Sequence, residues 1–158
     1  MKLSLFCIGK LSLSWLQEGA NEYSKRIKRY LPIDIEELKE SKIGGKKAES
    51  RQIMQQEGSQ LLARVPQGAY TVALDERGKL FSSEQLADFM SQHMLDGTPE
   101  IAFVIGGAYG LSDAVRDSAR LQLSLSPMTL THQMARVILL EQLYRGLTIL
   151  RNEPYHNR

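Results

Sequence analysis

The sequence contains very little cysteine and no long apolar run. Cys7 is the single cysteine among 158 residues, so no internal disulfide can form and a reducing compartment is indicated. No secretory signal is visible, because Lys2 and Lys10 bracket an apolar stretch that is too short. The longest uncharged run, residues 121–135, contains Ser, Gln, His and Pro, which excludes a membrane span. These absences predict a cytoplasmic protein without a membrane partner.

An excess of charge of either sign is also lacking. The chain has 20 basic and 18 acidic residues, a net charge of +2, which is far from the balance of a dedicated nucleic-acid binder. Basic residues do cluster at 25–29 and 46–51. These clusters are either solvated helix faces or local patches for RNA, and RNA binding would then need such patches or two copies of the chain.

Several motifs that carry known chemistry are missing. The three histidines are far apart, and neither H-E-x-x-H nor C-x-x-C occurs, so no metal site is predicted. There is no G-x-S-x-G, which excludes a nucleophile elbow. The glycines at 106, 107 and 110 form G-G-x-x-G, which is neither a dinucleotide fingerprint nor a P-loop. A phosphate cradle is therefore unsupported.

What the sequence does contain is a regular alternation of strand-like and helix-like segments. This alternation predicts an α/β fold with a mostly parallel sheet and helices on both faces, in a single domain over residues 1–158. Ser14 with Gln17, and Ser82 with Gln85, have the spacing of capping boxes at helix starts. The expected strands are 3–9, 33–38, 69–75, 101–105 and 121–126, and the expected helices are 14–31, one through Ile53 to Leu62, 82–95, one from Ser112, and 132–150.

Two adjacent glycines, Gly106 and Gly107, follow the buried strand 101–105 directly. Either the turn is merely tight, or a ligand approaches the bare backbone there. In parallel sheets, ligands bind beyond the carboxyl ends of the strands. A flat, uncharged base would suit this place if Leu74, Met128 and Leu130 supplied apolar walls.

The C-terminal part carries the remaining candidates. Arg136 and Arg145 point to opposite sides of the expected last helix, so only one of them can face a given site within one subunit. The tail 151–158 follows that helix and contains Pro154. It is either frayed or a source of hydrogen-bond donors, a stacking ring and an imidazole for a site.

Three stretches taken together, "VIGGAYGLS", "SLSPMTLTHQMARVILLEQLYRG" and "EPYHNR", resemble the RlmH family. The resemblance covers essentially the whole chain, including its length and its opening "MKLSLFCIGK". Members of that family are SPOUT-class methyltransferases that modify N3 of a pseudouridine in large-subunit (23S) ribosomal RNA on the assembled ribosome. The resemblance implies a C-terminal trefoil knot, S-adenosylmethionine as cofactor, a homodimer, and the ribosome as partner.

The resemblance also implies site residues. Arg136 would stabilise the developing charge, Tyr155 would stack or hydrogen-bond, and His156 would accept the proton, reaching across the dimer, with His132 as a further catalytic candidate. Thr131 departs from the proline that family members often carry, which predicts a less stiff loop and puts cofactor affinity in doubt. The implied cofactor-binding residues are Leu74, Gly106, Gly107, Ser126, Pro127, Met128, Thr129, Leu130 and Thr131.

Two other functions stay open at this point. One is a non-enzymatic ribosome-binding or assembly factor on the same sheet, which would associate with ribosomes without tight S-adenosylmethionine binding. The other is a small nucleotide-binding regulator, favoured by the glycine-rich turn alone and disfavoured by the missing phosphate motifs. Titration with S-adenosylmethionine and with a nucleoside triphosphate distinguishes the three.

Overall fold

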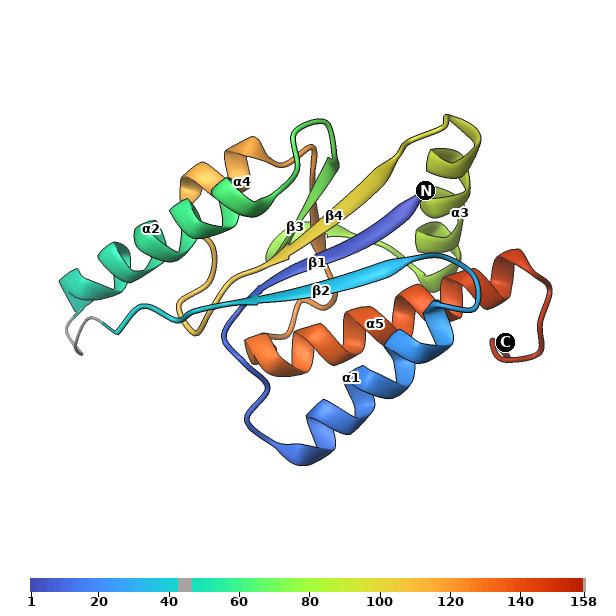
Figure 1. Ribbon diagram of the computed structural model, residues 1–158, viewed down its shortest axis with the longest axis horizontal. Coiled ribbons are helices and arrows are strands. Elements are labelled where there is room, and N and C mark those ends of the chain that lie inside the picture. The colour runs from blue at the N-terminus through green and yellow to red at the C-terminus, as the bar shows by residue number, and fades with distance from the viewer. Residues whose placement is uncertain (43–46, 158) are drawn as a thin grey trace.

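Five parallel strands form one sheet in the order β2-β1-β4-β3-β5 (Figure 1). The computed structural model describes residues 1–42 and 47–157. The strands are β1 (Lys2–Ile8), β2 (Ile33–Leu38), β3 (Tyr70–Leu80), β4 (Glu100–Ile105) and β5 (Leu121–Ser124). The helices are α1 (Ser14–Ile27), α2 (Lys47–Arg64), α3 (Ser83–Leu95), α4 (Asp113–Ser118) and α5 (His132–Leu150). The predicted alternation and the parallel sheet are confirmed.

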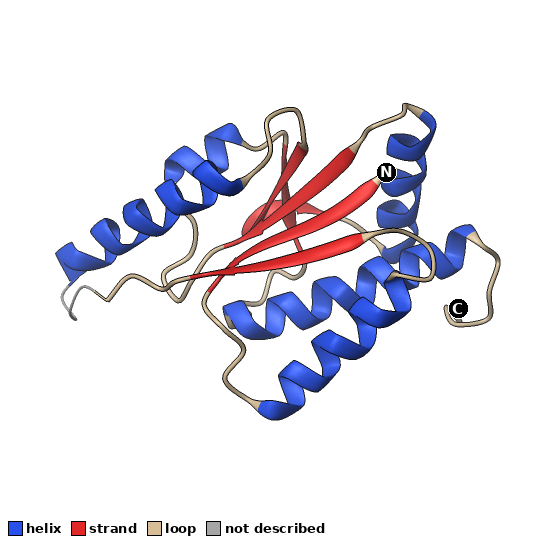
Figure 2. Ribbon diagram, viewed as in Figure 1, coloured by secondary structure: helices blue, strands red, loops and turns tan. Residues whose placement is uncertain are grey.

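Helices cover both faces of the sheet, with α1, α3 and α5 on one face and α2 and α4 on the other (Figure 2). Successive strand residues point to opposite faces, so Leu5 and Cys7 of β1 join the core beneath α1, α3 and α5. Phe6 and Ile8 join the smaller core beneath α2 and α4. Cys7 is fully buried as predicted, and burial raises the pKa of its thiol to about 11.

Helix capping agrees with the sequence at one predicted start and disagrees at another. Ser82 is the N-cap of α3, and both hydrogen bonds of its capping box with Gln85 are present. The capping box at Ser14 is wrong, because Leu13 is the N-cap of α1 and no side chain caps it. The predicted extension of that helix to residue 31 is also wrong, since α1 ends at Ile27. Across residues 1–42 and 47–157, none of the helices combines the length and the apolar character that crossing a bilayer demands.

Strand β3 runs five residues beyond the predicted end at Asp75, and its pairing with β5 is irregular. Leu74 and Lys79 both pair with Leu123, so residues 75–78 leave the ladder between them. Gly78 lies against the backbone of β5, where a Cβ would be 2.7 Å from the Gln122 carbonyl carbon. This excursion turns the charged residues at 75–77 toward the carboxyl edge of the sheet.

Candidate functional site

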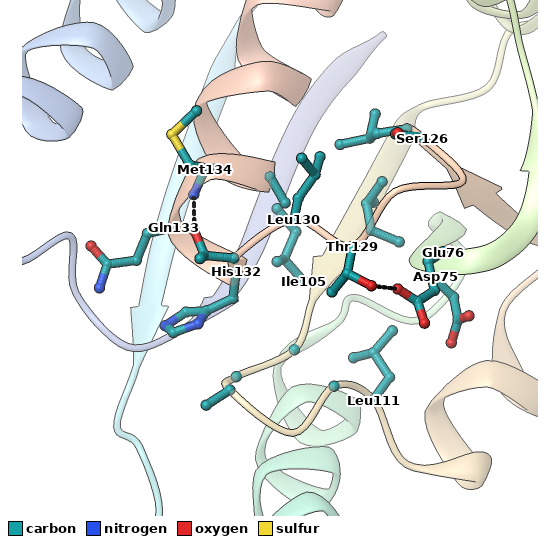
Figure 3. A pocket seen from close by; sticks show the side chains of 18 of the residues that line it. Asp75, Glu76, Ile105, Leu111, Ser126, Thr129, Leu130, His132, Gln133 and Met134 are labelled. Atoms are coloured by element: carbon teal, nitrogen blue, oxygen red, sulfur yellow. Dashed lines mark hydrogen bonds between the residues drawn. The ribbon is translucent and has the colours of Figure 1, made fainter.

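A pocket of about 1000 Å³ lies beyond the carboxyl ends of β1, β3, β4 and β5 (Figure 3). Its lining comes mainly from three segments, residues 74–77, 105–111 and 123–135, with a further contribution from residues 12–16. This is the edge at which parallel sheets bind ligands, and the volume lies within the usual range for small-molecule sites.

The predicted cofactor-binding residues converge on this pocket from separate parts of the chain. Pro127 is the exception, because it is not among the lining residues. The predicted residues that do line the pocket are Leu74, Gly106, Gly107, Ser126, Met128, Thr129, Leu130 and Thr131.

The inner part of the pocket is apolar and well packed. Ile105, Leu111 and Leu123 line it and are themselves buried, each with at most 3% of its surface exposed. Leu125 and Leu130 add further apolar surface. Such walls favour a flat aromatic group over a charged one.

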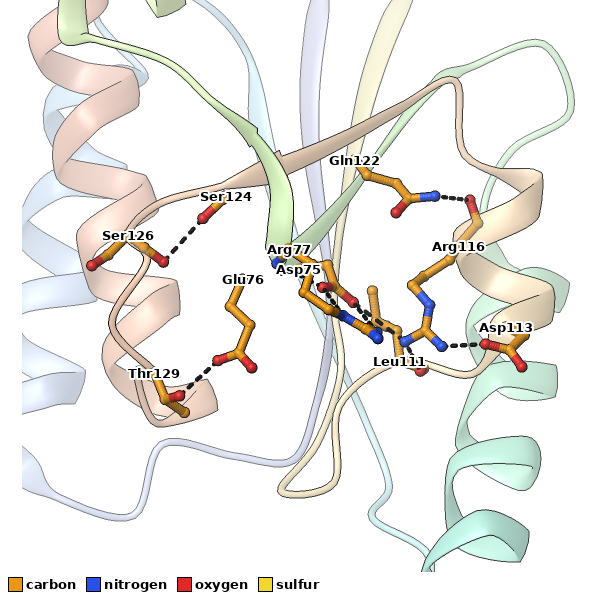
Figure 4. Close-up of polar contacts among 10 residues, drawn as sticks. All are labelled: Asp75, Glu76, Arg77, Leu111, Asp113, Arg116, Gln122, Ser124, Ser126 and Thr129. Carbon is orange, nitrogen blue, oxygen red and sulfur yellow. Dashed lines mark hydrogen bonds and ion pairs between the residues drawn. The ribbon is translucent and has the colours of Figure 1, made fainter.

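One side of the pocket is held together by ion pairs around Asp75 (Figure 4). Arg77 Nε and Arg116 Nη1 lie 3.1 and 3.3 Å from its carboxylate oxygens, and Arg116 Nη1 also donates to the Leu111 carbonyl at 2.7 Å. Burial opposes ionisation of Asp75, but Arg77 and Arg116 outweigh it and lower its pKa below the ordinary value. The carboxylate is therefore ionised at neutral pH, and the excursion of β3 at residues 75–78 is tied to the turn after β4 and to α4.

The loop between β5 and α5 has hydrogen bonds of its own. Ser124 Oγ donates to the Ser126 carbonyl at 3.0 Å, and Ser126 Oγ accepts from the Met128 N–H at 3.0 Å. Thr131 is the N-cap of α5, and its Oγ1 accepts from the Met134 N–H at 3.2 Å. The threonine that departs from the family pattern thus stabilises the start of α5 in a way that proline, which has no hydroxyl, could not.

Neither Gly106 nor Gly107 has room for a side chain, because other parts of the chain pack closely against both. A Cβ on Gly106 would lie 2.6 Å from the Gly110 carbonyl carbon, and the Gly110 N–H donates to the Gly107 carbonyl at 3.0 Å. A Cβ on Gly107 would lie 2.8 Å from Oε2 of Glu57 in α2. The tight-turn interpretation is confirmed. The resemblance also implies that the loop 126–131 passes close to the glycine pair, but the three atoms nearest to each position do not come from that loop. The approach of a ligand to Gly107 stays a prediction.

His132, at the first position of α5, lines the pocket with a side chain that is 17% exposed. Its Nε2 is buried without a hydrogen-bond partner in the part of the chain that the structure describes, and it lies 3.8 Å from the Glu40 carboxylate. Burial lowers the pKa of His132; Glu40 acts in the opposite direction, and Arg136 adds to the lowering. The imidazole is therefore neutral at pH 7 and able to accept a proton.

Arg136, one helical turn beyond His132, is not part of the pocket. Its guanidinium is 1% exposed, with Nη1 donating to Glu37 at 2.6 Å and Nη2 to the Gly9 carbonyl at 2.8 Å. It lines a smaller cavity of about 360 Å³ together with Glu37 and Lys10. Within one protomer, Arg136 joins α5 to β1 and β2.

Tyr155 and His156 belong to the tail after α5, which folds back beside the middle and the C-terminal half of that helix. Tyr155 donates to Glu141 at 3.0 Å, while the ring nitrogens of His156 lie 3.0 Å from Glu84 and 3.2 Å from Arg145. The tail is docked, so the frayed interpretation is wrong. Burial raises the pKa of Tyr155, as do its hydrogen bonds with Tyr23 and Glu141, so the phenol keeps its proton. One protomer does not bring these residues to the pocket.

Sequence reasoning missed two groups of lining residues. The charged run 75–77 begins at the last residue of the expected strand 69–75, and that position was a usable signal. Trp15 and Tyr109 were missed; together with Met128, which was predicted, they form an exposed apolar rim on the pocket, with 58%, 52% and 78% of their surfaces accessible. Exposure of large apolar side chains around one pocket is visible only in the folded chain, so no sequence pattern pointed to Trp15 or Tyr109.

Comparison with known proteins agrees with this architecture. Residues 1–156 match the family described as Predicted SPOUT methyltransferase. The chain is 56% identical, over the full length of both proteins, to Ribosomal RNA large subunit methyltransferase H of Syntrophotalea carbinolica. It is 48% identical to the protein of the same name from Trichlorobacter lovleyi, over 99% of this chain and 100% of that protein.

Solved structures resemble the chain at the level of the fold. A probable methylase family protein from Haemophilus influenzae Rd KW20 matches with a TM-score of 0.53 and 13% identity, over 99% of this chain and 70% of that one. A probable methyltransferase from Bordetella pertussis Tohama I matches with a TM-score of 0.52 and 13% identity, over 92% and 96%. The family match spans nearly all of the sequence, and the chain therefore belongs to the SPOUT methyltransferase family.

Proposed function

We propose that this chain is an S-adenosylmethionine-dependent methyltransferase that methylates N3 of a pseudouridine in large-subunit ribosomal RNA. The observation that carries the proposal is the pocket at the carboxyl edge of the sheet, where eight of the nine residues expected to bind the cofactor meet. The names of full-length relatives at 48–56% identity support ribosomal RNA as the substrate class.

The residues present fit S-adenosylmethionine by their chemistry. The apolar side chains of Ile105, Leu123 and Leu130 suit an adenine ring, and the bare backbone of the glycine turn offers it main-chain polar groups. The exposed carboxylate of Glu76, which lines the pocket, suits hydroxyl or ammonium groups. When bound, the cofactor supplies an electrophilic methyl group on a sulfonium.

The chain's own residues must hold the target base, remove its N3 proton and exclude water. N3 becomes a good nucleophile only after its proton has left, so the site needs a neutral base. His132 is such a base, since it lines the pocket of its own protomer and is neutral at pH 7. Trp15 and Tyr109 at the rim offer aromatic faces on which an unstacked RNA base can lie.

The working form is a homodimer in this proposal. Tyr155 is bonded to Glu141, nine residues along α5 from His132 and so about 14 Å away along the helix axis, and neither Tyr155 nor His156 lines the pocket of its own protomer. They act at a pocket only if a second copy presents its C-terminal end there. His156 then competes with His132 for the role of proton acceptor, and Tyr155, which keeps its proton, acts as a hydrogen-bond donor. Arg136 contributes to catalysis only indirectly, by holding in place β2 and the end of β1, to which it is hydrogen-bonded.

The partner in the cell is the ribosome, which places the protein in the cytoplasm. A net charge of +2 gives little general affinity for RNA, so an assembled particle must contribute shape and protein contacts to recognition. The trefoil knot and the single domain expected from the sequence stay predictions.

Methyl transfer to ribosomes tests the activity. Ribosomes that lack the modification are incubated with the protein and labelled S-adenosylmethionine, and RNA fragments are analysed by mass spectrometry. We expect one added methyl group on a pseudouridine of the large-subunit RNA. Leu130→Trp, which fills the pocket, should abolish transfer, whereas Leu95→Trp, at a leucine 79% exposed and outside the pocket lining, should not. Association with ribosomes without tight binding of S-adenosylmethionine would instead support the assembly-factor alternative.

Mixed dimers test the shared site. Chains carrying His156→Ala are combined with chains carrying Leu130→Trp, each inactive alone if the tail acts in the partner's pocket. Half of randomly formed dimers are then mixed and contain one working site, so activity should return to about a quarter of the wild-type value. Absence of any recovery would contradict the contribution of the partner's tail.

A further inference from the structure

Glu57 in α2 is a buried carboxyl group that the proposed activity does not use. It is only 4% exposed, and its Oε1 accepts from the Ser41 N–H at 3.2 Å. Its Oε2 is buried and has no hydrogen-bond partner in residues 1–42 and 47–157. Burying a carboxyl oxygen without a partner is costly, so such a group calls for an explanation.

The unpartnered oxygen faces the glycine turn. Oε2 of Glu57 would lie 2.8 Å from a Cβ built on Gly107, and Cγ2 of Ile8 would lie 3.1 Å from the same point. The next residue, Gly58, packs against Ser112, the N-cap of α4, so closely that a Cβ built on Gly58 would clash with the Ser112 hydroxyl. Glu57 and Gly58 therefore contact both ends of the segment 107–112, most of which lines the cofactor pocket.

The surroundings of Glu57 favour its neutral form. Burial raises the pKa of this carboxyl group above its ordinary value of 4.5, and Glu40 raises it further, against the effect of the Ser41 N–H. The contacts from β1 and from the glycine turn, Ile8 and Gly107, carry no charge. Glu40 faces Glu57 from the segment after β2, and His132 of α5 lies beyond Glu40, 3.8 Å from its carboxylate.

We propose that Glu57 is a positioning residue for the S-adenosylmethionine pocket, supporting the turn 106–111 from the side of α2 through its contact with Gly107. The carboxyl group fills the space behind the turn and restrains the turn on the side away from the pocket. Glu57 itself touches no cofactor. The inference rests on the proposed function, because it takes the pocket as the cofactor site.

The contribution of Glu57 to the stability of the turn should decrease as pH rises. The folded chain holds the Glu57 proton more tightly than the unfolded chain does, so its contribution to stability is complete below pH 4.5 and is lost as pH rises through the raised pKa. Ionisation places a carboxylate against Gly107 without a compensating donor, which loosens the turn. Cofactor affinity should decline over the same rise in pH.

Three variants of the full chain test the proposal without ribosomes. Glu57→Gln keeps the shape and cannot ionise, Glu57→Ala removes the support, and Ser59→Ala is a control at an exposed residue bonded only within α2. S-adenosylmethionine affinity is measured by calorimetry between about pH 5 and about pH 8, and hydrogen exchange is followed in residues 106–111.

We expect Glu57→Ala to bind the cofactor about tenfold more weakly than wild type and to exchange faster in the turn. Glu57→Gln should bind like wild type at low pH and lose the decline at higher pH, while Ser59→Ala should follow wild type throughout. Wild-type affinity and exchange in Glu57→Ala, or an unchanged decline in Glu57→Gln, would overturn the proposal. If Glu57→Ala does not fold, Glu57→Gln decides alone. Failure of the proposed function is recognised separately, as wild-type protein that binds no S-adenosylmethionine.

Discussion

The hydroxyl of Thr129 donates a hydrogen bond of 2.7 Å to Oε2 of Glu76, across the mouth of the pocket (Figures 3 and 4). Thr129 belongs to the loop before α5, and Glu76 belongs to the excursion that leaves β3. Both residues are exposed. The bond therefore adds little to folding, and its main effect is to hold two pocket segments at a fixed separation.

Thr129→Val removes this bond and keeps the side-chain shape. We expect S-adenosylmethionine to bind several-fold more weakly, because the loop must be ordered on binding, while the melting temperature changes by no more than about 2 °C. Calorimetry and thermal unfolding measure the two effects. Thr129→Ser is the matched control, since it keeps the hydroxyl that donates to Glu76. Unchanged cofactor affinity in Thr129→Val would show that the bond does not restrain the loop.

Breaking the ion pair of Arg136 with Glu37 should, in contrast to Thr129→Val, lower the stability of the fold. Arg136→Met removes two hydrogen bonds from a guanidinium that is 1% exposed and leaves Glu37, which is 37% exposed, without its partner. We expect a loss of about 2 kcal/mol, less than for a fully buried pair, since water can still reach the carboxylate. The melting temperature should fall by about 4 to 8 °C.

Arg151→Met, at an exposed arginine just beyond α5, serves as the control and should melt like wild type. Turnover measured on the same samples separates the two roles of Arg136. Lost turnover at an unchanged melting temperature would support the charge-stabilising role expected from the sequence and contradict the structural one.

The regular elements were predictable because local patterns determine them. Ser82 and Gln85 lie three positions apart, so their capping box forms from neighbouring residues alone. Ser14 and Gln17 have the same spacing, yet the Gln17 amide donates to the Leu11 carbonyl at 2.6 Å instead. A short loop before α1 offers this competing acceptor, and sequence spacing cannot show it.

The candidate site was predictable in part, for a different reason. The loops after β4 and β5 were expected to meet because parallel strands end at one edge. The contact of Gly107 with Glu57, by contrast, joins residues fifty positions apart through helix packing. The ion pair of Asp75 with Arg116 depends on the irregular pairing at 75–78. Both follow from tertiary contacts, which leave no periodic signal in the sequence.

His132 should titrate below its ordinary pKa of 6.5, because burial disfavours its charged form. Between the lowered pKa and pH 6.5, the unfolded chain binds more protons than the folded one, so the free energy of unfolding decreases as pH falls through this window. His132→Asn should weaken that decrease. NMR titration of the imidazole signals measures the pKa directly. A pKa at or above 6.5 would exclude His132 as a neutral base held ready in the pocket.

Trp15 should contribute to RNA binding and not to cofactor binding, since its exposed ring lies on the rim of the pocket. Stacking of one base on an aromatic side chain contributes about 1 to 3 kcal/mol, so Trp15→Ala should lower kcat/KM for ribosomes by about tenfold or more. Calorimetry should show cofactor affinity within about twofold of wild type, since the inner apolar walls are intact. Trp15→Phe, which keeps an aromatic face, should recover most of the loss. An exposed ring is also available for packing against a second copy of the chain. A Trp15→Ala protein that becomes monomeric in light scattering would assign Trp15 to the subunit interface and refute the stacking role.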